Sequence, residues 1–363
     1  MIWTLHQLAE FDSLQRDWQR LNQASTGSPL LATEFIVPLL QTFATGNELL
    51  ACCRIDGQAC AMLILTPRGL GNWQTFQPAQ APLGLCVQAS ELDWSACLLH
   101  LLPVLPGFAL ILGITQQDPE LAPRPVTGKL VTTIDYIRTG KITLGGSFES
   151  YWAQRGKNLR QNVKKQHARL ERDGIATRLE ISTAPQDVAQ AIADYGRLEG
   201  SGWKAEAGTA VHPDNLQGQF YRAMLEAFCR IGRGRIYRYW YDDKVAAMDL
   251  CIESNDCIVI LKTTYDESIP SHTSPALLMR HEAFAGLFAE GRTGRIEFYG
   301  KAMTWHTRWT DEFRTMYHIN LVRWHALRRL RDLLRDPLGR VTRPTPTRID
   351  TASSPSAMLE AAS

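Results

Sequence analysis

The chain has 363 residues, of which 45% are hydrophobic and 21% charged, proportions that fit a folded globular protein and exclude collagen-like and disordered classes. Its length predicts two domains, and its formal net charge of +2 gives no overall reason to expect a nucleic-acid binder. Residues 1–140 hold seven basic and eleven acidic side chains, so we expect an anionic ligand to bind the more positive remainder.

The eight cysteines form no C-x-x-C pair, and we expect reduced, buried thiols in a cytoplasmic protein with no metal site. The first residues lack the basic and apolar regions of a signal peptide. Trp94 to Gln117 is uncharged and long enough to cross a bilayer, but Pro103, Pro106 and Gly107 interrupt it. We therefore expect a buried helix and then a buried strand there, and no membrane span.

The first half has the pattern of a mixed α/β domain. Helices are predicted from Asp12 to about Leu21, after Ser28-Pro29, and over Trp94–Leu102. Predicted strands are Glu48–Ile55 and Ala59–Thr66, joined by a hairpin at Asp56-Gly57, then Asn72–Gln77, Phe108–Ile114 and Leu130–Ile137. The glycine-containing segment Thr139–Gly146 is predicted to be a linker.

The second half repeats this pattern with stronger signals. Predicted helices begin at Phe148 with Ser147 as cap, span Lys157–Arg172, run from Ala184-Pro185 to about Glu199, span Asn215–Ile231, run from Ser274-Pro275 to near Gly291, and span Trp324–Leu334. Predicted strands are Thr177–Ile181, Arg235–Tyr241, Val245–Ile252, Cys257–Thr264, Arg295–Tyr299 and Phe313–Leu321. Residues 338–363 are rich in Pro, Thr, Ser and Ala and are predicted to form a disordered tail.

No nucleophile elbow, zinc-peptidase, Walker or dinucleotide-binding motif is present in the sequence. The most informative segment is the strand ending in Lys262-Thr263-Thr264-Tyr265-Asp266-Glu267, followed by a helix that starts at Ser274-Pro275-Ala276-Leu277. The free amides of that first helical turn favour an anionic ligand. Lys262, in an otherwise apolar strand, needs an acidic partner or ligand, although a structural ion pair with Asp266 or Glu267 is the alternative.

Three further patterns have a functional and a structural interpretation. Glu199 precedes two glycines and then Trp203-Lys204, a build that suits either a ligand wall or a helix end with a core tryptophan. Aromatic and basic residues alternate from Phe298 through Lys301 to Trp309, as in an acceptor groove or in ordinary packing. Asp249 is a lone acid in an apolar strand, either a general base or a partly exposed residue.

The segment Arg155–Arg172 has seven basic residues and one acid, and Leu159, Val163 and Leu170 form a thin apolar stripe. Lys157, Arg160, Lys164 and Lys165 are predicted to project together from one side of a helix. Such a surface attracts phosphates or acidic chains, and a solvated helix face is the plain alternative.

Four segments together resemble the CelD-like, FemAB-related branch of the GNAT acyltransferase superfamily. They are S-F-E-S-Y-W-A-Q-R-G-K-N-L-R-Q-N-V-K-K (147–165), E-G-S-G-W-K-A-E-A-G-T-A (199–210), F-Y-R-A-M-L (220–225) and L-K-T-T-Y-D-E with S-P-A-L-L (261–278). The resemblance implies two tandem GNAT-like domains, a degenerate one over 1–140 and an acyltransferase domain over 147–335. Family members usually carry S-P-G at the helix start, where this chain has Ser274-Pro275-Ala276, and the usual pyrophosphate loop is missing.

The resemblance implies transfer of an acyl group to an amine, such as one on a glycan or a cell-envelope precursor. The donor is an acyl-CoA co-substrate, an acyl carrier or an aminoacyl-tRNA, and no cofactor is permanently bound. The expected donor site is Ser274, Ala276 and Leu277, with Lys262, Tyr265, Asp266, Glu267 and Asp249 as catalytic candidates. Glu199, Trp203, Lys204, Lys301 and Trp309 are the acceptor candidates. The alternatives are a non-catalytic GNAT-fold binding module, or a protein that docks on RNA or an acidic partner through residues 155–172.

Overall fold

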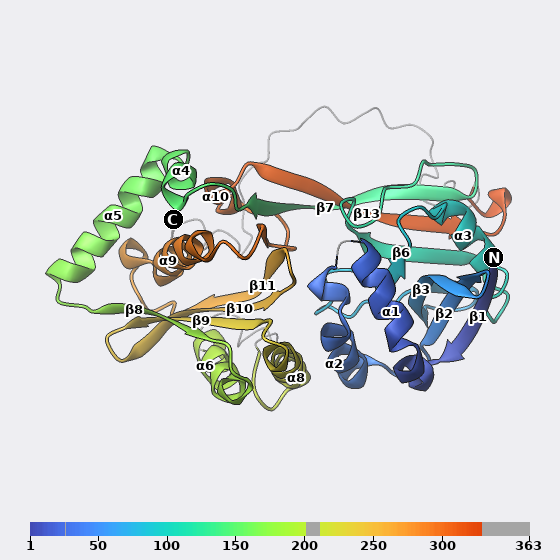
Figure 1. Cartoon of the computed structure of the whole chain (residues 1–363), viewed down its shortest axis with the longest axis horizontal. Helices are drawn as coiled ribbons and strands as arrows, with labels where there is room; N and C mark the ends of the chain where they lie inside the picture. The colour runs from blue at the N-terminus through green and yellow to red at the C-terminus, as the bar shows by residue number, and fades with distance from the viewer. Residues whose placement is uncertain (26, 201–210, 329–363) are drawn as a thin grey trace, which may run out of the picture.

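The computed structural model describes residues 1–25, 27–200 and 211–328, and in this part of the chain thirteen strands form one continuous sheet (Figure 1). The first half comprises β1 (Ile2–Gln7), the 3₁₀ helix η1 (Leu8–Glu10), α1 (Phe11–Ser25), η2 (Pro29–Leu31), α2 (Thr33–Phe43), β2 (Leu49–Ile55), β3 (Gln58–Pro67), β4 (Asn72–Thr75), β5 (Cys86–Gln88), α3 (Trp94–Leu101), β6 (Ile111–Gln117) and β7 (Val131–Thr143). The second half comprises α4 (Phe148–Ala153), α5 (Lys157–Arg172), β8 (Thr177–Ser182), η3 (Pro185–Asp187), α6 (Val188–Gly200), α8 (Leu216–Arg230), β9 (Gly234–Tyr241), β10 (Lys244–Glu253), β11 (Cys257–Tyr265), η4 (Ser271–Thr273), α9 (Pro275–Glu290), β12 (Arg295–Glu297), α10 (His306–Trp309) and β13 (Glu312–Val322).

The two halves repeat one order of elements. In the second half the antiparallel strands β9, β10 and β11 are followed by α9 and then by β12, which pairs with β11 in parallel. In the first half β2, β3 and β4 are followed, after the short β5, by α3 and then by β6, which pairs with β4 in parallel. Parallel neighbours need a crossover connection, which the helix supplies in both halves. The predicted mixed α/β fold with two tandem units is therefore confirmed.

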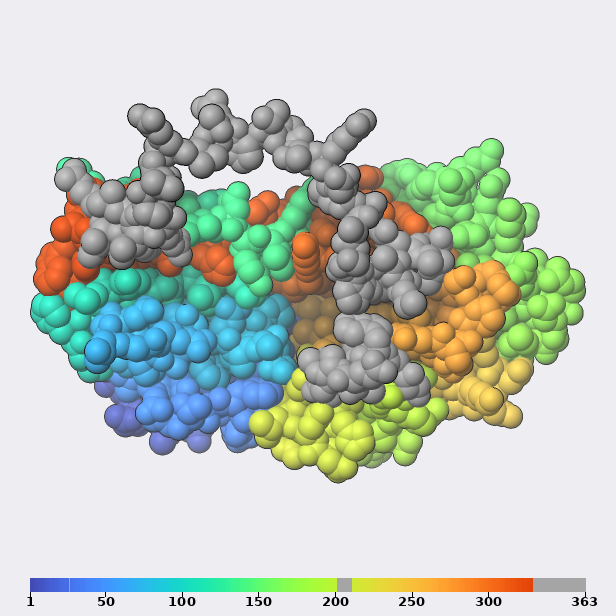
Figure 2. All heavy atoms as spheres, turned by 180° about the vertical axis from the view of Figure 1, so that it is seen from behind, coloured from blue at the N-terminus to red at the C-terminus, as the bar shows by residue number. Residues whose placement is uncertain are grey.

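Each half ends on a strand that pairs with the other half. β7 follows β6 in the chain but pairs with β12 of the second half, whereas β13 follows β12 but pairs with β6 of the first half. β7 and β13 also pair with each other over most of their length. Figure 2 shows red-orange atoms from the end of the described chain among the teal atoms of the first half. The two halves are thus interlocked through their last strands.

Helices cover both faces of the sheet. One face carries α1, α2, α6 and α8, whose apolar side chains belong to one core that extends under both halves. The rings of Phe35 in α2 and Phe220 in α8 lie 5.5 Å apart edge to face, a direct contact between the halves. The opposite face carries α3 over the first half and α4, α5 and α9 over the second, with a separate core under each group.

Most predicted elements are present with ends shifted by a few residues. β2 and β3 form the predicted hairpin, and Asp56 and Gly57 both have the positive φ that a tight two-residue turn requires. Ser147 caps α4 as predicted, its hydroxyl accepting a hydrogen bond from the Ser150 amide. The uncharged segment 94–117 contains α3 and then β6, and no helix of the described residues is both long and apolar enough to cross a membrane. All eight cysteine thiols are free, and all but Cys60 are buried.

Several sequence predictions are wrong. The helix expected from Pro29 is one 3₁₀ turn, and α2 begins at Thr33 because the extended backbone of Ala32 separates the two. The linker expected over 139–146 is strand as far as Thr143, since β7 finds hydrogen-bonding partners in both β12 and β13. Five short elements are not predicted at all: β1, β5, α10 and the 3₁₀ turns η1 and η4.

The basic helix α5 has the bounds predicted for it. Its apolar stripe of Leu159, Val163 and Leu170 is buried in the core beneath α9, as expected. Of the predicted projecting cations, Lys157, Lys164 and Lys165 are exposed. Arg160 differs, because it is half-buried and its Nε donates a hydrogen bond to the Arg155 carbonyl at 3.0 Å. The predicted helix over 324–334 is described only to residue 328, and the tail over 338–363 lies outside the described residues.

Candidate active site

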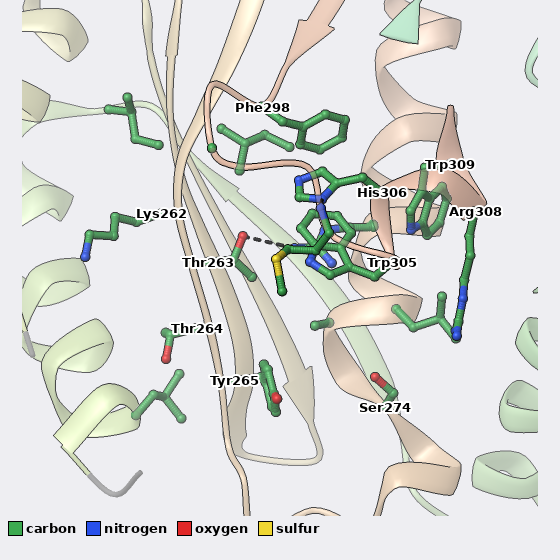
Figure 3. Close-up of a pocket in the computed structure, with 18 of the residues that line it drawn as sticks. Lys262, Thr263, Thr264, Tyr265, Ser274, Phe298, Trp305, His306, Arg308 and Trp309 are labelled. Carbon is green, nitrogen blue, oxygen red and sulfur yellow. Dashed lines mark hydrogen bonds between the residues drawn. The ribbon is translucent and has the colours of Figure 1, made fainter. Parts of the chain in front are cut away.

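The principal cavity of the described chain opens where β11 and β12 stop pairing. The two strands pair in parallel over only three residues, Cys257–Val259 with Arg295–Glu297, although β11 continues to Tyr265. A cavity of about 330 Å³ lies along this unpaired stretch, between the start of α9 and the segment that follows β12 (Figure 3). The polar end of β11, which the sequence analysis singled out, therefore forms one wall of this cavity.

The amino-terminal turn of α9 forms a second wall. Ser274, Ala276 and Leu277 all line the cavity, so the structure brings the three predicted donor-site residues together. Pro275 occupies the first helical position, and the Ser274 side chain makes no capping hydrogen bond within the described residues. The first-turn amides of a helix have no intrahelical acceptors, so this turn offers donors to an anion.

A bulge in β11 decides which side chains face α9. Leu250 pairs with Lys262 but the next residue of β10, Cys251, pairs with Ile260, so Leu261 is an extra residue in β11. Beyond this bulge Thr263 and Tyr265 point toward α9, while Lys262 points to the opposite face of the sheet (Figure 3). There its ammonium lies 5.7 Å from the ring centroid of Tyr221 in α8. Lys262 therefore points away from Ser274, although both residues line the cavity.

On the α9 face, Thr263 joins a buried acid to a buried cation. The Thr263 hydroxyl donates to Asp249 Oδ1 at 2.5 Å and accepts from Arg280 Nη2 at 3.1 Å. Asp249 is 1% exposed, so the alternative of a partly exposed strand position is wrong. Burial raises the pKa of the Asp249 carboxyl, an effect that the Arg280 charge and the Thr263 hydrogen bond oppose. Asp249 does not itself line the cavity, but Thr263 does.

Arg280 is a buried cation on the cavity wall. Burial lowers its pKa, while the Asp249 charge acts in the opposite direction. Its guanidinium lies 4.1 Å from the centroid of the Trp305 ring, and its Nε has no hydrogen-bond partner among the described residues. The His306 ring stacks on Trp305 and accepts a hydrogen bond from the Met303 amide at Nδ1. Burial lowers the pKa of His306 to about 4, so near neutral pH its ring is uncharged and carries its proton on Nε2.

The remaining strand-end candidates separate into two groups. Tyr265 and Glu267 line the cavity, and burial raises the pKa of the Tyr265 hydroxyl. Asp266 instead stabilises the turn after β11, because its Oδ1 accepts hydrogen bonds from the Ser268 amide and hydroxyl at 2.9 and 2.6 Å. Neither carboxylate is in an ion pair with Lys262 in the structure.

The predicted acceptor residues are only partly gathered at the cavity. Glu199 lines it from the end of α6 and accepts a hydrogen bond from the Val211 amide at 2.6 Å. Trp309 lines it as well, although it is 2% exposed and its carbonyl accepts from the Tyr151 hydroxyl. Lys301 is exposed and is not among the residues that line this cavity. Trp203 and Lys204 lie outside the described residues.

Sequence analysis missed Arg280, Thr263 and His306 as site residues. Arg280 had a readable signal, because it stands four residues after Ala276 and four before Phe284, within the buried stripe of α9. A charged residue in such a stripe needs a partner or a ligand. Among the described residues no group of three or more His, Cys, Asp or Glu side chains is placed to hold a metal ion.

The matching position in the first half is filled by the chain itself. Beyond the parallel pairing of β4 and β6, the hydroxyls of Thr75 and Thr115 are 2.6 Å apart. The Gly84 amide donates to the Thr115 carbonyl at 3.2 Å, and a Cβ on residue 84 would overlap both threonines. The space between the ends of β4 and β6 therefore has no room for a ligand of the size that the cavity of the second half accommodates.

Residues 157–307 match the family model described as an acetyltransferase (GNAT) domain. The matched residues run from the start of α5 into α10 and lie within the second half. A comparison with curated protein sequences finds no match.

Several crystal structures have the same fold at low sequence identity. FemX is 9% identical, with a TM-score of 0.55 over 91% of this chain and 99% of its own. The C-terminal domain of a candidate lysylphosphatidylglycerol synthetase from Agrobacterium fabrum is 12% identical, with a TM-score of 0.54 over 88% and 94%. A conserved protein of unknown function from Bacteroides thetaiotaomicron is 9% identical, with a TM-score of 0.53 over 89% and 100%. These likenesses extend over both halves and show a shared tandem fold.

Proposed function

We propose that the protein is an N-acyltransferase that takes an acyl group from acyl-CoA at the start of α9 and passes it to an amine. The observation that carries this proposal is one cavity that joins the free amides of the α9 turn to the Thr263–Asp249 pair. The first supplies a site for the anionic carrier, and the second supplies a proton acceptor. The first half, 1–140, is then a degenerate domain without a donor site, consistent with the filled space between β4 and β6.

The donor enters on the α9 side. Its phosphates lie at Ser274, Ala276 and Leu277, where amide donors and the helix dipole favour negative charge. Its acyl end reaches the inner part of the cavity, lined by Arg280, Trp305 and His306. Because Ala276 replaces the usual glycine and the pyrophosphate loop is missing, an acyl carrier or an aminoacyl-tRNA is the alternative donor.

The chemistry needs no covalent intermediate on the protein. The amine nitrogen attacks the thioester carbonyl carbon, forming the C–N bond, and the C–S bond then breaks. The amine proton passes to the Thr263 oxygen as the Thr263 hydroxyl proton moves to Asp249, which a raised carboxyl pKa favours. The leaving thiolate takes its proton from Tyr265, whose raised pKa keeps it protonated until then.

The acceptor enters on the α6 and α8 side. Lys262 and Glu199 line the cavity from there and position the acceptor, and Glu267 is proposed to assist them. A glycan or cell-envelope amine is the acceptor class we propose, in keeping with the CelD-like and FemAB-related resemblance. The name of one structural neighbour, a candidate lysylphosphatidylglycerol synthetase, indicates a membrane lipid as that protein's product, with a hydroxyl rather than an amine as acceptor. A CoA donor and free thiols both fit a cytoplasmic location.

The proposal is tested with the full chain and a panel of donors. Acetyl-CoA, longer acyl-CoAs and aminoacyl-tRNA are compared by thermal shift, since a ligand of the folded state raises the melting temperature. Thiol release with a panel of amines then measures turnover. Thr263→Val should abolish turnover but retain donor binding, whereas Thr139→Val, which removes a buried hydroxyl without a partner, should retain both. Donor binding with no turnover for any amine would support the non-catalytic binding module instead.

A further inference from the structure

Four loops meet at one end of the sheet in the first half. Asn72 pairs with Ile111, Ile111 with Val322, and the preceding residue Leu321 with Val131, so these strand ends lie together. The loops there are 68–71, 102–110 and 126–130, together with 323–328, whose last four residues form a helical turn. This end lies at the right of Figure 1, where the red-orange strand β13 finishes.

The composition of these loops is unusual for a protein surface. They contain no aspartate or glutamate, and they carry the basic residues Arg68, Lys129, Arg323 and Arg328. Of the thirteen large hydrophobic side chains exposed in the described chain, five belong to them: Leu70, Val104, Phe108, Val126 and Trp324. Leu70 is fully exposed and Val126 is 90% exposed. We call these five side chains and four cations the loop-end surface.

Contacts between the loops hold the loop-end surface together. The rings of Phe108 and Trp324 are 5.6 Å apart, and the Arg323 guanidinium lies 4.4 Å from the Phe108 centroid. The Leu110 amide donates to the Gly71 carbonyl at 2.6 Å, which ties the Leu70 loop to the Phe108 loop. The Arg328 guanidinium donates to the Gly128 carbonyl, which ties in the loop of Val126 and Lys129.

The backbone at Phe108 is strained in a way that core packing does not explain. Phe108 has a φ of +52°, in the left-handed region that a bulky residue avoids, and its side chain is 63% exposed. This backbone conformation presents the Phe108 ring to solvent, where it contacts the Trp324 ring and the Arg323 guanidinium. Strained residues that persist without a packing reason are associated with function.

We propose that the loop-end surface binds the surface of an anionic phospholipid bilayer. Tryptophan and phenylalanine favour the headgroup region, and aliphatic side chains at loop tips can enter it at different depths. Four cations with no acid among them match a negatively charged leaflet. The inference is independent of the proposed acyl transfer, because the loops lie on the first half, away from the cavity of the second.

The test is co-sedimentation of the full chain with vesicles. We expect binding to vesicles of phosphatidylglycerol mixed with phosphatidylcholine, and at least about tenfold weaker binding to phosphatidylcholine alone. The variant Leu70→Ser, Phe108→Ser, Trp324→Ser should weaken binding at least about tenfold. The control variant Ile181→Ser, Leu216→Ser, Ile231→Ser changes three exposed hydrophobic side chains elsewhere and should bind like the original.

A second variant separates charge from apolar contact. Arg68→Gln with Lys129→Gln should reduce the preference for phosphatidylglycerol while leaving thermal stability unchanged, since both side chains are exposed. Failure to bind either vesicle would overturn the inference, as would equal binding by the triple serine variant. Dimerisation of the original protein that the triple variant abolishes, seen by light scattering without vesicle binding, would assign the surface to a second copy and likewise overturn it.

Discussion

Arg314 of β13 and Asp118, which are 196 residues apart in the chain, form a two-point ion pair at the junction of the two halves. Arg314 Nε and Nη2 donate to the two Asp118 oxygens at 2.8 and 2.6 Å, and Nη2 is also 2.8 Å from Glu297 Oε2 in β12. The Arg314, Asp118 and Glu297 side chains are 8%, 1% and 2% exposed. The Arg314 guanidinium thus forms ion pairs with one carboxylate from each half of the protein.

Replacing Arg314 by Met should lower the free energy of unfolding by about 3–5 kcal/mol, because it removes a cation from two buried carboxylates and leaves Asp118 with the Tyr299 hydroxyl and Glu297 with the Arg295 guanidinium. Chemical denaturation of the full chain measures the change. The matched change Arg222→Met removes an exposed pair with Glu226 and should cost less than about 1 kcal/mol. Equal losses of unfolding free energy for the two variants would show that the buried ion pair stabilises the fold no more than the exposed one.

Asp249→Asn should lower kcat by about 10²–10⁴-fold, the usual contribution of a general base. The base must be deprotonated to act, so the rate of the original enzyme should rise with pH through the pKa of Asp249. Since burial raises that pKa, the rise should occur above the pH range of an ordinary aspartate. An Asp249→Asn enzyme with the original rate and pH profile would remove the proton relay from the mechanism.

Leu277→Glu should weaken donor binding, because it places a negative charge in the first turn of α9 beside the proposed phosphate site. The fold should tolerate it, since an acid near a helix amino terminus is favourable. Gln219→Glu adds the same charge to the first turns of α8, away from the cavity, and serves as control. Isothermal titration with the donor should show at least about tenfold weaker binding for Leu277→Glu alone.

Lys262→Ala should raise the KM for the amine acceptor and leave donor affinity unchanged, because Lys262 faces α8 rather than α9. Steady-state kinetics with each substrate varied in turn distinguish the two effects. A change in donor affinity alone would contradict the acceptor role and assign Lys262 to the donor site.

Glu290→Gln should destabilise the protein by about 1–3 kcal/mol near neutral pH. Hydrogen bonds from Arg235 lower the pKa of Glu290 to about 2 from its usual 4.5. A lowered carboxyl pKa stabilises the fold above the unfolded-state value, and this contribution is lost as pH falls through the folded-state value. The difference between the original and Glu290→Gln should therefore disappear between about pH 4.5 and pH 2, as melting curves across that range will show.

The bulge at Leu261 explains why the site was only half predictable. Alternation counted from the core residues Ile258 and Ile260 would place Lys262 on the α9 face. One inserted residue reverses that assignment and presents Thr263 instead. The polar strand end and the helix start at Ser274 were predictable because they are local. The partnership of Asp249, Thr263 and Arg280 joins three elements and has no local signature.

The linker error has a similar cause. Glycines at 140, 145 and 146 are typical of a connection, but Gly140 lies within β7, where a Cβ would lie 3.1 Å from the Phe313 ring of β13. That glycine permits close strand packing rather than a flexible joint. Only the position of β13, more than 170 residues later, shows this.

The exchange of final strands has a consequence for how the protein matures. During synthesis the edge of β6 has no neighbour until residues 312–322 leave the ribosome, so the first half waits for nearly the whole chain before its sheet is complete. An open strand edge is a site for wrong pairing with other chains. Truncation before β13 should therefore yield aggregates rather than an isolated amino-terminal domain, and a nascent chain of this protein is a natural client for chaperones.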